Sequence, residues 1–578
     1  MAEYESNPLS VVDYIVLALL LILLIGMGIY HGMAKRRPTT TRSFFLADRS
    51  VFSLPVALTL LASFISPVTL LGNAAETYVY GAQYVVDLMQ RLASMLTIVL
   101  LYVPVFYDLD ITTSYQYLQL RYGFPMRLLG AVCFLFQTIF YIAIVSYSPA
   151  LVVNAVTNLN LWVIIVTTGL VCTFYSALGG IKAVIWTDVV LVIVIGGTTI
   201  LIIISCTVMA GGVKQVWDIN NAAGRLDIFT FPLDLTERMT FSSVFLGTYF
   251  SNLIIWGVSQ TAVQRFLSSR TLKDAKRSLW INLPFSILVT GAATCQGIVL
   301  YAFYHTEDDT ISPTSYCDET SGGCAGTPPP VYVHQPPNYT LPDQIIMIFV
   351  NQQFSNIWGY QGLFISCIFA GALSTVSSGI NSMVAVTMED IWKPLRRWLA
   401  KMRNKELEED DKKDTRLSKI LSLIFGLLTI VLAILTSRLG TLVTLVNSIF
   451  GIFGGPILAA FTLGMVWPRA NSRAVLVGTL TSFILGLWIV IGSYVNADRL
   501  EDVIVVYRLS FLWYAMCTIL TNITISVILS EIIRFLDPKE RNKVVDPKLL
   551  CAWVRPKFVR NVSEVETKTD NDKITTEI

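Results

Sequence analysis

The chain has 578 residues, of which 54% are hydrophobic and only 14% are charged. A soluble protein of this length needs more polar surface than that composition supplies, and the formal net charge of +2 gives no basic field for binding nucleic acid. Many apolar runs instead reach the roughly 20 residues that cross a bilayer. They predict an all-α polytopic membrane protein with no large soluble domain.

The apolar runs predict about thirteen transmembrane helices. The first run, Val11 to Tyr30, lacks the basic flank of a cleavable signal peptide, so we expect it to remain as a helix. We expect one transmembrane domain over 1–535 and a tail over 536–578. The runs fall near residues 10–32, 51–74, 84–106, 127–154, 159–178, 183–210, 241–263, 276–304, 358–387, 417–435, 441–466, 473–494 and 508–534.

Lys and Arg residues in short loops predict the orientation of the chain. Basic clusters follow the first, seventh and ninth predicted helices, and an odd number of helices places all three clusters on one side, which we expect to be cytoplasmic. The N-terminus is then extracellular, and the loop over 390–416 and the C-terminus are cytoplasmic. The clusters are Lys35, Arg36, Arg37, Arg42 and Arg49; Arg265, Arg270, Lys273, Lys276 and Arg277; and Lys393, Arg396, Arg397, Lys401 and Arg403.

A polar loop over 305–341 independently favours this orientation. Cys317 and Cys324 share the loop and could form a disulfide outside the cell. Asn338 begins an Asn-Tyr-Thr acceptor for N-glycosylation. Both features are typical of an extracellular segment.

The chain ends with Thr575-Thr576-Glu577-Ile578. A free end of this form can add as a strand to a PDZ domain. A disordered tail without a partner is the alternative interpretation.

The second predicted helix, 51–74, has a helix breaker and polar residues at its centre, which is typical of a transport site. Pro67 has no N–H, so the carbonyl of Ser63 loses its helical partner, and proline moves Ser66 away from the α conformation. We expect the backbone to unwind and to expose carbonyls, which must face protein or a water-filled cavity. Thr69 adds a hydroxyl at the same depth. A simple proline kink is the alternative.

The ninth predicted helix carries a line of small polar side chains. Ser374, Ser377, Ser378 and Asn381 recur at i, i+3, i+4 and i+7, which places them on one helical face. Their neutral oxygens suit a monovalent cation better than Ca²⁺, which usually recruits carboxylates. Close packing of helices through small residues is the alternative.

Three other predicted helices contain candidate residues. Asp188 lies within the sixth helix, where an acid is costly; it could balance a bound cation or pair with Lys182, and the sequence leaves both possibilities open. The seventh and the eleventh predicted helices also contain candidate residues, and for both of them helix packing is the alternative to a functional role. The seventh helix, in which Gly257 permits a bend, contains Asn252, Trp256, Gly257, Ser259 and Gln260. The eleventh helix, expected to be flexible or broken, contains Asn447, Ser448, Gly451, Gly454, Gly455 and Pro456.

Several classes of function lack the residues that they need. The histidines, His31, His305 and His334, lie at predicted helix ends or in loops, and the sequence shows no metal cluster, nucleophile or acid–base set. A phosphate loop of the form G-x-x-x-x-G-K-[ST] is also absent, so uphill transport must draw on an ion gradient. A membrane enzyme is disfavoured because the sequence shows no catalytic set of residues.

Five sequence patterns are distributed along the chain. They are Ala62-Ser63-Phe64 with Ser66 and Gly72; Tyr175 to Gly180 followed by Lys182 to Asp188; Leu373-Ser374-Thr375; Glu389-Asp390 with Pro394; and Gly454-Gly455-Pro456 with Leu463-Gly464-Met465. Together they resemble the sodium:solute symporter family, and within it the animal branch of sodium-coupled monocarboxylate, multivitamin and iodide transporters. The resemblance spans nearly all of 10–535.

The resemblance implies a LeuT-like fold, in which five helices are repeated in inverted orientation and the second and seventh helices are broken. The repeats are expected over about 51–210 and 241–466. It also implies sodium-driven uptake by alternating access at the plasma membrane, with Na⁺ as the coupling ion and no other cofactor. Matching positions place one sodium ion at the carbonyls of Ala62, Ile65 and Gly371 and the hydroxyls of Ser374 and Thr375, near Asp188. Matching substrate-facing positions are Phe64, Thr69, Asn252, Trp256 and Asn447, with Gln90 and Tyr141 near the cavity.

The chain departs from the usual pattern of this branch at Pro67, Ile181 and Leu191. Thr69 resembles the monocarboxylate carriers more than the iodide carriers, which favour an amide there. We therefore expect a sodium-coupled importer of small organic anions, either monocarboxylates or carboxylate vitamins such as biotin and pantothenate. An iodide or other inorganic-anion symporter is the main alternative; a non-transporting receptor or scaffold with this fold, and a channel, are others.

Overall fold

The computed structural model describes residues 9–33, 49–157, 159–232, 234–306, 341–402, 411–436, 440–496, 503–541 and 545–555. Within these ranges the chain forms helices and no strand, apart from an isolated bridge between Val51 and Ser269. The all-α prediction is therefore confirmed. The predicted Cys317–Cys324 disulfide, the Asn338 acceptor and the end of the chain at 575–578 lie outside the described residues.

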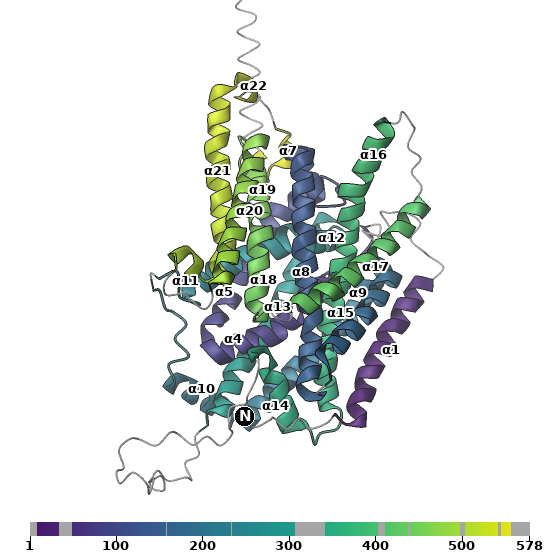
Figure 1. The fold of residues 1–578 in the computed structure, drawn as a ribbon, viewed down its shortest axis with the longest axis vertical. Helices are drawn as coiled ribbons and strands as arrows, with labels where there is room; N and C mark the ends of the chain where they lie inside the picture. The colour runs from purple at the N-terminus through teal and green to yellow at the C-terminus, as the bar shows by residue number, and fades with distance from the viewer. Residues whose placement is uncertain are drawn as a thin grey trace, which may run out of the picture.

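The helices lie side by side as one bundle (Figure 1). The first part contains α1 (Val11–Met33), α3 (Ser53–Phe64), α4 (Asn73–Tyr80), α5 (Val86–Thr97), α6 (Val103–Asp108), α7 (Tyr115–Tyr122), α8 (Phe124–Thr157), α9 (Leu161–Met209) and α10 (Val213–Ala222). The second part contains α11 (Phe241–Asn252), α12 (Gln260–Phe266), α13 (Leu272–Tyr304), α14 (Ile345–Phe354), α15 (Tyr360–Val386), α16 (Lys393–Met402), α17 (Asp411–Thr436), α18 (Leu442–Ile449), α19 (Gly455–Val466), α20 (Ser472–Val495), α21 (Tyr514–Leu536) and α22 (Pro538–Arg541).

Short π-helical segments join several of these helices into longer spans. They are η2 (Val68–Gly72), η4 (Ile98–Tyr102), η5 (Leu253–Val258), η8 (Thr387–Trp392) and η9 (Phe450–Gly454). π-Helical turns are rare and occur frequently at functional sites. Three of the five, η2, η5 and η9, lie in the helices that the sequence singles out for breaks.

Ten helices among the described residues are long and apolar enough to cross a membrane, and the bent pair of α3 and α4 makes eleven. Two further predicted spans correspond to shorter apolar segments, Val11–Leu20 of α1 and Leu161–Val171 of α9. Exposed apolar side chains on α17, such as Leu427 and Val431, are suited to contact lipid. The multi-pass architecture is confirmed, whereas the exact number of thirteen spans stays a prediction.

α9 differs from the prediction of two helices over 159–178 and 183–210. The structure continues one helix of 49 residues from Leu161 to Met209. Gly179 and Gly180 each lower helix propensity by about 1 kcal/mol, but neither removes a backbone N–H as a proline would. A straight helix of this length would be about 74 Å long, against roughly 30 Å for the hydrocarbon core. α9 therefore has as many residues as two crossings need, but it contains no turn that would let the chain cross back.

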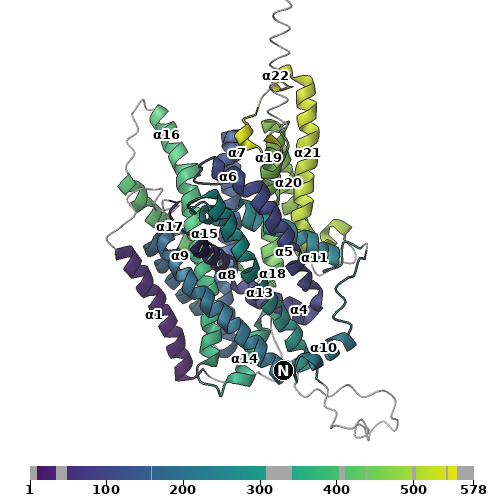
Figure 2. The same cartoon turned by 180° about the vertical axis from the view of Figure 1, so that it is seen from behind.

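α15 occupies the centre of the bundle. All its residues from Phe364 to Val386 are buried, and it packs against α3, α8 and α9. α1 lies at one edge of the bundle and α21 at the other, in both views (Figures 1 and 2). The polar face predicted for the ninth helix is therefore enclosed by other helices rather than exposed to lipid.

Candidate functional site

The chain between α3 and α4 is broken near the middle of the bundle. α3 ends at Phe64, and Ile65 leaves the helical conformation with φ −81° and ψ 84°. Pro67 follows, and its missing N–H prevents the next helical hydrogen bond. The two halves, Ser53–Phe64 and Val68–Tyr80, are bent by 62°. The predicted break in the second helix is confirmed.

The break exposes backbone oxygens inside the protein. The N–H of Ile65 donates to Leu61, but no backbone N–H in the described part of the chain donates to the carbonyl of Ala62 or Ile65. Both residues are buried. Since buried carbonyls without partners are costly, these oxygens are suited to hold water or a cation.

α15 passes close to this break. A Cβ placed on Gly371 would lie 3.2 Å from the carbonyl oxygen of Ile65 and 3.3 Å from Cδ of Pro67, so glycine permits the approach. Thr375 lies one turn further along the same face, and its buried hydroxyl has no hydrogen-bond partner among the described residues. The structure thus brings together the unwound main chain and the hydroxyl-bearing face that the sequence predicts.

Asp188 of α9 is fully buried behind this face. Its carboxylate accepts hydrogen bonds from Thr59 Oγ1 and from Ser374 Oγ, each at 2.5 Å. Its positively charged partner is Arg265 of α12, with Nη2 at 3.8 Å from Oδ2. The sequence offered a bound cation or Lys182 as the partner; the structure gives a third one, and the side chain of Lys182 is not described.

Arg265 corrects a prediction, because the sequence analysis placed it in a cytoplasmic loop. It lies within α12 and is only 2% exposed. Its guanidinium donates to Thr59 Oγ1 at 3.2 Å, to the carbonyl of Thr261 at 2.9 Å and to Ser378 Oγ. A buried cation is costly unless it is paired, so Arg265 and Asp188 form one buried polar unit beside the break.

A cavity of about 110 Å³ lies on the other side of the break. The rings of Phe64 and Trp256 form part of its wall, with centroids 4.6 Å apart. Of the seven residues predicted to face the substrate or to lie near its cavity, six line this cavity: Phe64, Thr69, Tyr141, Asn252, Trp256 and Asn447. Their proximity is observed, and their role in binding stays a prediction.

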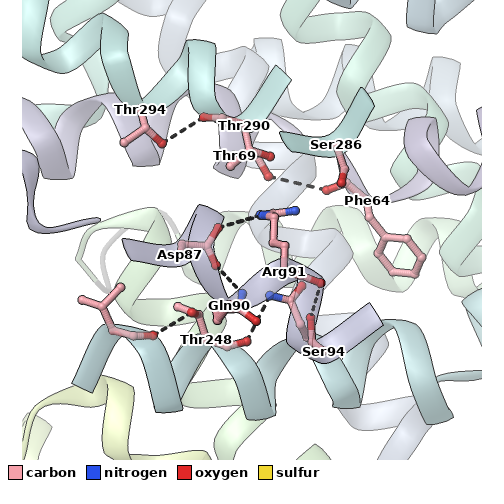
Figure 3. Close-up of polar contacts among 12 residues, drawn as sticks. Phe64, Thr69, Asp87, Gln90, Arg91, Ser94, Thr248, Ser286, Thr290 and Thr294 are labelled. Carbon is pink, nitrogen blue, oxygen red and sulfur yellow. Dashed lines mark hydrogen bonds and ion pairs between the residues drawn. The ribbon is translucent and has the colours of Figure 1, made fainter. Parts of the chain in front are cut away.

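Gln90 does not line the cavity but supports a residue that does. It is fully buried, and its Nε2 donates to Oδ1 of Asp87 at 2.8 Å. Asp87 and Arg91 both line the cavity, and Arg91 Nη2 lies 2.7 Å from Asp87 Oδ2 (Figure 3). The sequence analysis missed this pair, although opposite charges at i and i+4 within an apolar run are a detectable signal.

The seventh predicted helix is broken, whereas the eleventh is not. α11 passes through η5 to Ser259, whose ψ of 133° ends the helix before α12 begins. The break therefore lies at Ser259 rather than at Gly257. The eleventh helix continues through α18, η9 and α19 as one span, Leu442–Val466. Its glycines serve close packing instead: a Cβ on Gly454 or Gly455 would collide with Ile254 or Thr518.

Comparison with known proteins agrees with this arrangement. Residues 44–486 match the model of the sodium:solute symporter family. The chain belongs to the sodium:solute symporter family. It is therefore a membrane transporter rather than an enzyme, and Na⁺ is its coupling ion.

The relatives of this symporter include several animal transporters. Sodium-coupled monocarboxylate transporter 2 of Mus musculus is 35% identical over 94% of this chain and 87% of its own length. The sodium-dependent multivitamin transporter of Oryctolagus cuniculus is 37% identical over 86% of this chain and 73% of its own. Sodium-coupled monocarboxylate transporter 1 of Homo sapiens is 36% identical over 84% of this chain and 74% of its own length.

A solved structure of a Na⁺-coupled sialic acid symporter in a substrate-bound outward-open state resembles this symporter with a TM-score of 0.73. It is 23% identical, and the match covers 90% of this chain and 98% of the other. The likeness shows the fold, which is the LeuT-like inverted repeat of five helices with two broken helices.

Proposed function

We propose that this symporter imports a small organic anion, either a monocarboxylate or a carboxylate-bearing vitamin, together with sodium ions by alternating access. The names of the animal relatives support this substrate class. The cavity beside the break supports it as well, because it combines an apolar wall at Phe64 and Trp256 with hydroxyl and amide groups.

The proposed sodium site comprises the carbonyls of Ala62, Ile65 and Gly371 and the hydroxyls of Ser374 and Thr375. The observation that carries it is the buried, unpartnered hydroxyl of Thr375 one turn from the close approach between Gly371 and Ile65. Oxygen ligands of this kind suit a hard cation, and their neutrality suits a monovalent one. Asp188 stands behind Ser374 and supplies negative charge to the site.

Sodium binding at this position would couple to substrate binding through the break itself. Ile65 contributes to the proposed sodium site and also lines the substrate cavity. A ligand shifts a conformational equilibrium only through its different affinity for the two states. One Na⁺ moving down about 100 mV supplies roughly 2.3 kcal/mol, and two Na⁺ per anion would give net inward charge.

Replacing Gly371 by alanine tests the close approach at the sodium site. The added methyl group would lie 3.2 Å from the carbonyl oxygen of Ile65 and 3.3 Å from Cδ of Pro67, so these neighbours must shift by a few tenths of an ångström. Overpacking costs up to about 1–3 kcal/mol. We expect the Na⁺ concentration for half-maximal uptake to rise. The matched control is Gly196→Ala in α9, where a Cβ meets nothing within 4 Å. Unchanged sodium dependence in Gly371→Ala would contradict this role for the contact.

We further propose a plasma-membrane location with an extracellular N-terminus and a cytoplasmic C-terminus. The basic helix α16 lies at the same end of the bundle as α7 and α22, and α10 and α14 lie at the opposite end (Figure 1). This arrangement is consistent with the distribution of Lys and Arg.

The proposed organisation of the chain follows from this orientation. The transmembrane domain occupies 1–535 with repeats over about 51–210 and 241–466. The loop over 305–341 would be extracellular, with the Cys317–Cys324 disulfide and the Asn338 glycan, and the loop over 390–416 cytoplasmic. The tail over 536–578 would be cytoplasmic, and its end is a candidate PDZ ligand.

Uptake by proteoliposomes containing the full chain tests the proposed function. Radiolabelled lactate, pyruvate, nicotinate, biotin, pantothenate and iodide would each be offered with a Na⁺ gradient or with K⁺ in its place. We expect sodium-dependent uptake of at least one carboxylate. Sodium-dependent uptake of iodide alone would favour the inorganic-anion alternative, and uptake of none would favour a receptor or scaffold.

A further inference from the structure

The central cavity contains one ion pair. Of the described residues that line it, only Asp87 and Arg91 carry charged side chains. They lie on successive turns of α5, with side chains 5% and 15% exposed. Because both side chains are largely buried, their charges are screened less than on a protein surface. The pair therefore dominates the electrostatics of the space that the substrate would occupy.

The two partners of this pair differ in their unused hydrogen-bonding capacity. Oδ2 of Asp87 accepts from Nε of Arg91 at 3.0 Å and from Nη2 at 2.7 Å, and Oδ1 accepts from Gln90 Nε2 at 2.8 Å. The carboxylate is thus almost saturated. The guanidinium has five N–H groups, and those not used for Asp87 have no acceptor among the described residues. The ion pair therefore offers donors to a ligand and few acceptors.

The remaining cavity wall places an apolar surface and hydroxyls around this donor group. Figure 3 shows the guanidinium of Arg91 between Asp87 and the side that carries Thr69 and Ser286. Phe64 and Trp256 supply the apolar wall. The cavity volume of about 110 Å³ lies below the roughly 300–1,000 Å³ of sites for drug-sized ligands, which favours a compact solute.

We propose that Arg91, held in place by Asp87 and Gln90, binds the carboxylate of the transported anion, and that the substrate is a short-chain monocarboxylate. The proposal rests on the function proposed above and narrows its substrate class. The planar guanidinium matches a carboxylate through directional hydrogen bonds, while the short apolar body of the substrate packs on Phe64 and Trp256.

Other solutes fit this arrangement less well. A cation would meet the exposed side of Arg91 and find the oxygens of Asp87 already occupied. The corresponding neutral amide would lose the charge-assisted bonds, which are about twice as strong as neutral ones. A spherical inorganic anion would gain charge attraction but could not use the planar geometry of the guanidinium.

Paired uptake of propionate and propionamide by the full chain in proteoliposomes tests this assignment, because the two solutes have nearly the same shape. The wild-type chain is expected to take up propionate with Na⁺ and to discriminate against propionamide. Arg91→Gln should raise KM for propionate by about 10- to 100-fold and abolish the discrimination. Arg91→Lys should give an intermediate KM, since lysine keeps the positive charge but lacks the planar set of N–H donors of the guanidinium.

Asp87→Asn separates a binding role from a structural one. It weakens the contact that holds Arg91 in place but keeps the positive charge of the guanidinium, so KM for propionate should rise while the preference for propionate over propionamide persists. If the pair were only structural, Asp87→Asn and Arg91→Gln would impair uptake alike and leave the preference unchanged in both. That result would overturn the proposal.

Two controls keep folding and function apart. Stabilisation of each purified variant by Na⁺ reports an intact fold independently of substrate, and Arg473→Gln, at an exposed position of α20, controls for loss of an arginine. If the wild-type chain shows no sodium-dependent uptake of propionate, the short-chain assignment is wrong. If it also takes up none of the other carboxylates with Na⁺, the proposed function is wrong as well. Normal wild-type uptake with an unchanged KM in Arg91→Gln would overturn the role of Arg91 alone.

Discussion

Replacing Ser374 and Thr375 together by alanine is expected to abolish sodium-dependent uptake while the protein still reaches the membrane. The change removes the two side-chain ligands of the proposed sodium site. A hydrogen-bond-like contact to a charged group is worth roughly 1.5–3 kcal/mol, so two of them account for about 3–6 kcal/mol of binding free energy. That is at least a 100-fold loss of Na⁺ affinity, by about 1.4 kcal/mol per tenfold.

The matched control for this double variant is Ser382→Ala on the same helix. Ser382 is buried like the two target residues, but its hydroxyl donates only to the backbone carbonyl of Ser378, at 2.8 Å. Sodium dependence of uptake and surface expression should both stay normal in the control. Normal sodium dependence of uptake in the double variant would contradict a sodium site at Ser374 and Thr375.

Breaking the buried pair of Asp188 and Arg265 is expected to have the second large effect. Asp188→Asn leaves a buried arginine without its counter-charge, and Arg265→Gln leaves a buried carboxylate. Each change is expected to destabilise the protein by about 3–5 kcal/mol. The thermal unfolding of the purified variants measures this loss, and uptake should be lost in both.

The double variant Asp188→Asn with Arg265→Gln distinguishes two roles of Asp188. Because neither charge is then left unpaired, most of the stability should return. Sodium-dependent uptake should not return, since the negative charge behind Ser374 is still missing. Recovery of uptake along with stability would show that Asp188 only anchors the structure.

The broken second helix could be predicted from the sequence because its cause is local. Proline at position 67 acts on the residues immediately before it, and the oxygens of α15 recur at helical spacing. The meeting of these two segments could not be derived from their spacing, as they are about 300 residues apart. The resemblance to a known family supplied that link, and the geometry at Gly371 agrees with it.

Arg265 was misplaced because sequence-based orientation counts charges by position along the chain. The helix breaks at Ser259 and resumes as α12, so an arginine that seemed to follow the span lies inside the bundle. Its neighbours Phe266 and Leu267 are fully buried. Apolar residues on the C-terminal side of an arginine were the available signal that the helix had not ended.

Asp87 and Arg91 were overlooked for a different reason. Mean hydropathy over a span hides two opposite charges among many apolar residues, and the span Ala82–Asp108 still passes as a membrane helix. Their spacing of four residues predicts an ion pair. Only the three-dimensional structure places that pair in the same cavity as Phe64 and Trp256.

The most direct test of the sodium site is Na⁺-dependent thermal stability of the purified Thr375→Val variant. Valine keeps the shape of threonine, and the lost hydroxyl has no partner among the described residues, so stability without Na⁺ should be unchanged or higher. A bound ion stabilises the folded state by RT ln(1 + [Na⁺]/Kd). We expect Na⁺ to raise the Tm of the wild-type protein and to have little effect on Thr375→Val. An equal rise in both proteins would contradict a sodium ion held between the broken helix and α15.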